Sequence, residues 1–129
     1  MRYEKVIPWC KEMGFDQFFE KFPNGYMTLL GEEGANISGG QKQLVGLARA
    51  LYKNPDVLLI DEGTAAMDRD TEKFVMSLLQ RLKQQKGILM VTHRVQTAME
   101  SDEVYLLEDG KVVDSGKPLD LVEKESFFE

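Results

Sequence analysis

The run Ser38-Gly39-Gly40-Gln41, which opens a helix-forming segment, constrains this chain more than any other feature. Ser38 and Gln41 have the spacing of an N-cap residue and its N3 partner, and such a capping box stabilises a helix by about 1 kcal/mol. That explanation leaves out Gly39 and Gly40, because each glycine in a first helical turn costs roughly 1 kcal/mol relative to alanine. Without side chains they expose backbone N–H groups and the positive end of the helix dipole, which attract phosphate oxygens. Two interpretations stay open: an ordinary capped helix and a phosphate-binding turn.

A pair of acids follows the next apolar run. Residues 57–60 have the pattern of a parallel strand buried on both faces, and Asp61 and Glu62 come directly after them. The carboxyl end of a parallel strand faces the crevice where α/β folds bind ligands, although solvated acids at a strand end are the plainer alternative. One acid could hold Mg²⁺ while the other polarises an attacking water, as phosphoryl transfer requires.

His93 ends the neighbouring apolar run, residues 88–91, in a similar way. A strand, a helix and a strand in that order form a βαβ unit with a right-handed crossover, which brings the two strand ends close together. We therefore expect His93 beside Asp61 and Glu62, with a purely structural histidine as the alternative.

Composition restricts the class of protein. The net charge of −6 and the pI near 4.9 argue against a nucleic-acid surface, which needs a net basic face. Cys10 is the single cysteine, so no internal disulfide can form and a reducing compartment is expected. No apolar run approaches the roughly 20 residues that cross a bilayer, and the N-terminus lacks a signal-peptide pattern. We expect a soluble domain whose link to any membrane runs through a partner.

The sequence changes character near Asn54-Pro55, where we place a boundary between residues 1–55 and residues 56–129. Before it, the apolar spacing predicts two short helices broken at Gly14 and at residues 23–25, followed by a helix from Ser38 to just before Asn54. The aromatic residues there are expected to pack in a helical layer, with a docking face as the alternative. After the boundary, the pattern predicts a strand at 57–60, a helix at 70–86 ended by Gly87, a strand at 88–91, a hairpin turning at 108–110 and a helix at 118–124.

With these residues located, the chain resembles the nucleotide-binding domain of an ABC transporter over nearly all of its 129 residues. Five segments carry the resemblance: residues 36–41 match the signature motif, residues 57–61 the Walker B strand, Glu62 the catalytic glutamate, residues 66–68 the D-loop and His93 the switch histidine. Residues 28–34 resemble the segment that exporters place before the signature motif, which points to an exporter. The implied α/β fold is a partial P-loop NTPase (RecA-like) core with parallel strands, residues 56–129, plus an α-helical signature subdomain, residues 1–55.

The resemblance implies a head-to-tail dimer in which each signature motif covers the ATP held by the other subunit's phosphate loop. The residues that would contact the γ-phosphate in trans are Ser38, Gly39, Gly40 and Gln41.

The resemblance also assigns the residues of hydrolysis. Asp61 would order Mg²⁺, and Glu62 would activate water. His93 would sense the γ-phosphate, and Asp68 would join the two sites across the interface. The implied cofactors are ATP and Mg²⁺. The implied partners are a second nucleotide-binding domain and a transmembrane domain, with no nucleic acid, and the implied location is the cytoplasmic face of a membrane.

Some features depart from the family pattern. Gly63 stands where proline is usual and Ala65 where serine is usual, so this loop loses stiffness and a hydroxyl. No Gly-x-x-x-x-Gly-Lys-Ser/Thr phosphate loop occurs in the 129 residues. We therefore interpret the chain as the C-terminal part of such a domain, and expect it alone to hydrolyse no ATP and to leave apolar sheet surface uncovered.

Three functional hypotheses follow. The first is an ATP-hydrolysing subunit of an ABC exporter that couples hydrolysis to transmembrane transport, with peptides or bacteriocin-like molecules as the expected cargo. The second is a non-catalytic interaction module that docks on a membrane subunit or on a complete ATPase. The third, a soluble ABC ATPase acting on DNA or ribosomes, is disfavoured by residues 28–34 and by the acidic charge balance.

Overall fold

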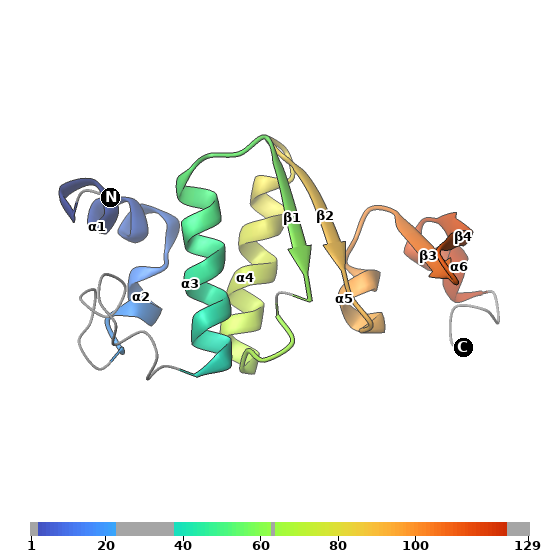
Figure 1. The fold of residues 1–129 in the computed structure, drawn as a ribbon, viewed down its shortest axis with the longest axis horizontal. Helices are drawn as coiled ribbons and strands as arrows, with labels where there is room; N and C mark the ends of the chain where they lie inside the picture. Colours follow the sequence, from blue (N-terminus) through green and yellow to red (C-terminus); the bar gives the residue numbers. More distant parts are fainter. Residues whose placement is uncertain (1–2, 23–37, 63, 124–129) are drawn as a thin grey trace. The chain divides into compact units, whose positions relative to one another are not determined.

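The computed structural model describes residues 3–22, 38–62 and 64–123, which fall into two compact units, residues 1–90 and 91–129. The elements of the first unit are α1 (Tyr3–Met13), α2 (Asp16–Phe19), α3 (Gly39–Tyr52), β1 (Val57–Asp61), α4 (Arg69–Leu82) and all but the last residue of β2 (Gly87–Val91). Those of the second are α5 (Val95–Met99), β3 (Val104–Glu108), β4 (Lys111–Gly116) and α6 (Pro118–Val122). Strands β1 and β2 pair and run in the same direction (Figure 1), so the predicted α/β class with parallel strands is confirmed.

The two predicted helices at the start of the chain are present as α1 and α2. Gly14 separates them with a φ of +93°, a conformation that a residue with a side chain rarely adopts. The amide groups of Gly14 and Phe15 donate to the carbonyl of Cys10 at 2.9 and 2.8 Å. These bonds satisfy one of the carbonyl groups that the end of α1 leaves without a helical partner. The predicted turn at residues 23–25 lies outside the described residues.

Helix α3 begins and ends where the sequence predicts. Ser38 is its N-cap, and Asn54, two residues after the last helical residue, has a φ of +52°. Asparagine tolerates this left-handed conformation, and the following Pro55 disfavours continued helix.

Helix α4 ends earlier than predicted, at Leu82 instead of Lys86. Lys86 leaves the helix and its Nζ donates to Asn54 Oδ1 and to the Pro55 carbonyl, both at 2.6 Å. Gly87 does not end a helix; its amide donates to the carbonyl of Asp56 at 2.9 Å and it is the first residue of β2. Contacts with residues about 30 positions away therefore hold Lys86 outside this helix.

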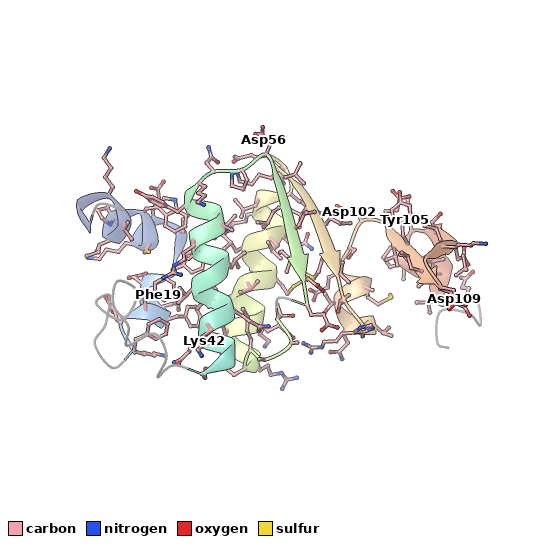
Figure 2. All side chains as sticks on the ribbon, viewed as in Figure 1. Phe19, Lys42, Asp56, Asp102, Tyr105 and Asp109 are labelled. Carbon is pink, nitrogen blue, oxygen red and sulfur yellow. The ribbon has the colours of Figure 1, made fainter. Side chains whose placement is uncertain are left out.

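The hydrophobic core of the first unit lies on one face of the β1–β2 sheet. Alternate strand residues join the core with α3 and α4: Leu58 is buried, and Ile60, Ile88 and Met90 pack against it. Figure 2 shows the side chains of α3 and α4 on this side of the strands. The other face is open, since Val57, Leu59 and Leu89 are 60%, 71% and 56% exposed. The prediction that these strands are buried on both faces is therefore wrong for this chain, whereas the expected uncovered apolar surface is present.

The hydrophobic core contains residues from both sides of the boundary predicted at residue 55. Phe15 of the α1–α2 segment is fully buried, and its ring meets Phe74 of α4 edge-on at 5.3 Å between centroids. Phe19, labelled in Figure 2, belongs to the same core. The aromatic residues of the first segment therefore pack inside a helical layer. The compact units divide at residue 90, and the boundary at residue 55 stays a prediction about the domains of a complete ATPase.

The second unit contains the predicted hairpin. Strands β3 and β4 are antiparallel, and Asp109 and Gly110 between them have φ values of +52° and +77°, as a two-residue turn of the hairpin type requires. Helix α6 ends two residues earlier than predicted, and α5 was not predicted. Within the described ranges, no helix has the length and apolar character needed to cross a membrane.

Candidate functional site

The capping box at the start of α3 is formed as predicted. The amide of Gln41 donates to Ser38 Oγ at 3.1 Å, and the amide of Ser38 donates to Gln41 Oε1 at 2.8 Å. These two reciprocal bonds fix the first turn of the helix. The amides of Gly39 and Gly40 have no carbonyl within the helix to donate to, as in the first turn of any α-helix.

Gly40 is buried, and the structure gives it a packing role. A Cβ at this position would lie 2.4 Å from the carbonyl oxygen of Ala66 and 3.0 Å from the Cα of Met67. These are backbone atoms, so they cannot move aside as a flexible side chain would. The close approach that was expected to involve a phosphate is made here, at Gly40, by the chain's own loop after β1.

Gly39 differs from Gly40. Gly39 is exposed, and a Cβ added there would meet only the Cβ of Ala66, at an ordinary contact distance of 3.5 Å. Packing against the described residues therefore does not require glycine at position 39. The phosphate interpretation of Gly39 stays a prediction.

The acid pair lies at the carboxyl end of β1. Asp61 is the last residue of the strand and is exposed, while Glu62 is half-buried and has a φ of +51°. This left-handed conformation is uncommon for a residue with a long side chain. The chain turns sharply at Glu62, and the amide of Ala65 donates to the Glu62 carbonyl at 3.1 Å.

Gln43 of α3 holds this loop from the other side. Its Nε2 donates to the carbonyl of Glu62 at 3.2 Å, and its Oε1 accepts from the amide of Ala66 at 3.1 Å. Gln43 was not among the predicted site residues. Its partners are 19 and 23 positions away, so neither motif spacing nor helical periodicity points to it.

Asp68 lies at the end of the same loop and caps α4. Its Oδ1 accepts from the amide of Thr71 at 2.8 Å, and hydrogen bonds from the Thr71 side chain and then its backbone lower the pKa of the Asp68 carboxyl. Earlier in this loop, Thr64 is buried, and the Thr64 carbonyl accepts from the amide of Met67 at 3.1 Å. In this chain Asp68 has a structural role in addition to the interface role that the resemblance implies.

His93 follows the end of β2 by two residues, is exposed and belongs to the second unit. Its position beside Asp61 and Glu62 stays a prediction. Residues 28–37, which include the exporter-like segment and the start of the signature motif, lie outside the described residues, as does Gly63. Within the described part of the chain, no three His, Cys, Asp or Glu side chains are grouped to hold a metal by themselves.

Comparison with known proteins identifies the family. The model of the ABC transporter family matches residues 4–65. The alpha-hemolysin translocation ATP-binding protein HlyB of Escherichia coli is 37% identical over 129 residues, which are 99% of this chain and 18% of that protein. Multidrug resistance protein 1 of Entamoeba histolytica is 36% identical over 125 residues, 97% of this chain and 10% of that protein.

A solved structure agrees with this assignment. A bacterial Atm1-family ABC exporter with ATP bound superposes with a TM-score of 0.81 at 35% identity, covering 96% of this chain and 22% of the exporter chain. The chain thus spans between 10% and 18% of the length of these two curated relatives. It belongs to the ABC transporter family and corresponds to a portion of an exporter-type nucleotide-binding domain.

Proposed function

We propose that the chain contributes to both composite ATP sites of an ABC exporter dimer: the phosphate cap of α3 to one site and the water-activating acid after β1 to the other. One observation carries the proposal. The start of α3 and the loop holding Glu62 are joined by the Gly40–Ala66 backbone contact and by both hydrogen bonds of Gln43. Cap and acid are therefore joined in one element, as expected of a chain that covers the ATP of one composite site and supplies the acid of the other.

The cap would bind the γ-phosphate held by a second nucleotide-binding domain. Ser38 Oγ is already bonded to the amide of Gln41, so the phosphate would meet the amides of Gly39 and Gly40 and the hydroxyl of Ser38. Gln41 would act by fixing the turn, since its side chain is bonded to the Ser38 amide.

Mg²⁺ fits the acid end of β1. This ion is usually held by one or two carboxylates, with water and substrate phosphates completing its octahedron. The exposed Asp61 offers one such carboxylate, and a larger protein cage is not needed. When bound, Mg²⁺ would neutralise charge on the β- and γ-phosphates.

Glu62 would accept a proton from the water that attacks the γ-phosphate in line, and His93 would sense the γ-phosphate. Asp68 would bridge the two composite sites. These roles come from the family resemblance and fit the position of Glu62 at the carboxyl end of a parallel strand.

The same proposal includes the partners and the location of the protein. The partners are a second nucleotide-binding domain and a transmembrane domain, the location is the cytoplasmic face of a membrane, and a molecule is transported across it. HlyB and the leukotoxin protein LktB of Mannheimia glucosida, which is 37% identical over 123 residues, are named for toxin translocation. This supports export of a peptide-type cargo by the protein that carries this chain.

The test uses a graft in which residues 1–129 replace the matching segment of HlyB, so that the rest of HlyB supplies the polypeptide needed to complete the ATP site. We expect the graft to hydrolyse ATP and the 129-residue chain alone to hydrolyse none. A folded graft without turnover, which still binds ATP, would favour the non-catalytic docking module instead.

A further inference from the structure

The side chain of Gln43 connects two backbone groups of the loop after β1. Its Nε2 lies 3.2 Å from the carbonyl oxygen of Glu62, and its Oε1 lies 3.1 Å from the amide nitrogen of Ala66. The first partner can only accept and the second can only donate, so the orientation of the Gln43 amide is fixed by its partners. Glutamine is the uncharged side chain with enough reach and both a donor and an acceptor at its end.

The bridged segment contains an unfavourable backbone conformation. Glu62 has a φ of +51°, which a residue with a side chain adopts only when its surroundings hold it there. Its carbonyl accepts from Gln43 Nε2 and from the amide of Ala65 at 3.1 Å. Only the first of these two bonds comes from outside the loop, and it ties Glu62 to α3.

We propose that Gln43 is the positioning residue for Glu62: its bridge to the Glu62 carbonyl and the Ala66 amide holds the Glu62 backbone in its left-handed conformation and fixes the acid to the phosphate-capping turn of α3. The inference rests on the proposed function, in which Glu62 activates water. Gln43 itself is half-buried, and in this proposal it acts through Glu62.

The bridge is tested first in the 129-residue chain, by amide hydrogen exchange resolved at Ala66. Gln43→Leu removes both bonds, whereas Gln43→Glu keeps an acceptor for the Ala66 amide and loses the donor to Glu62. Loss of one net hydrogen bond predicts roughly tenfold faster exchange at Ala66 in Gln43→Leu. Gln43→Glu should retain the protection. Gln80→Leu, an exposed glutamine of α4, is the matched control and should leave Ala66 unchanged.

The consequence for Glu62 is tested in the HlyB graft by steady-state ATP hydrolysis. Both Gln43 variants should lower kcat by roughly tenfold or more with little change in KM for ATP, because both lose the bond to Glu62 and neither removes a nucleotide contact. A merely structural role would instead lower the amount of folded protein and leave kcat per folded site unchanged.

Two results would overturn the inference: unchanged exchange at Ala66 in Gln43→Leu, or full kcat in both variants of an active graft. If Gln43→Leu does not fold, Gln43→Asn gives the same comparison, since it is one methylene too short to reach both partners. An unsubstituted graft without turnover would count against the proposed function, while the exchange measurement would still decide whether the bridge exists.

Discussion

Alanine substitution at three glycines of α3 should give three different changes in stability. At Gly46, which is exposed, an added Cβ meets nothing within 4 Å, so Gly46→Ala gains helix propensity and should stabilise the chain by about 0.5–1 kcal/mol. At Gly39 the nearest atom is 3.5 Å away, and a small change is expected. At Gly40 the Cβ would lie 2.4 Å from the Ala66 carbonyl oxygen, well inside van der Waals contact.

The magnitude at Gly40 is the difference between two effects. Forcing backbone apart in a packed site costs typically about 1–3 kcal/mol, and the helix-propensity gain of alanine offsets about 1 kcal/mol of that. Gly40→Ala should therefore lie about 1–3 kcal/mol below Gly46→Ala in free energy of unfolding. Urea denaturation followed by circular dichroism at 222 nm, with the three variants and the parent chain side by side, measures this. Equal stabilities of Gly40→Ala and Gly46→Ala would refute the packing role of Ala66.

Three further predictions concern single side chains. Ser38→Ala removes the acceptor for the Gln41 amide and should lower the free energy of unfolding by about 1 kcal/mol in urea denaturation, whereas Ser38→Thr keeps the hydroxyl and most of the stability. Burial, followed by the charge of Asp16, raises the pKa of the Cys10 thiol from 9.0 to about 11. The buried neutral thiol therefore contributes to stability below pH 9, and this contribution is lost as pH rises toward 11. Urea midpoints across this range should fall more steeply for the parent chain than for Cys10→Ala; parallel curves would contradict this. The lowered pKa of Asp68 predicts the opposite sign: its contribution is present above its ordinary pKa of 3.8 and is lost as pH falls through the lower folded value. Asp68→Asn should lack that part of the acid dependence in thermal unfolding, and an unchanged acid profile would count against the cap.

Features set by neighbouring residues were predictable from the sequence. The capping box of Ser38 and Gln41 spans three residues, and the Asp109-Gly110 turn spans two, so each is encoded where it forms. The order of the strands and helices, apart from α5, followed in the same way from local apolar periodicity. These local signals also located the acid pair at the end of β1.

Features that depend on distant contacts were not predictable. Lys86 is held outside α4 by its bonds to Asn54 and Pro55, and the need for glycine at position 40 comes from the backbone of Ala66. Gln43 finds partners 19 and 23 residues away. An apolar strand pattern also does not show whether residues of the same chain cover both faces of the strand. Strand β1 is apolar throughout residues 57–60, yet one of its faces is exposed.

The central claim is that Glu62 activates water in a nucleotide site completed by other polypeptide. The most direct measurement compares ATP turnover and ATP binding in the HlyB graft with and without Glu62→Gln, a change that keeps the size of the side chain and removes its charge. We expect turnover to be lost while bound ATP is retained. Turnover equal to that of the unsubstituted graft would contradict the account.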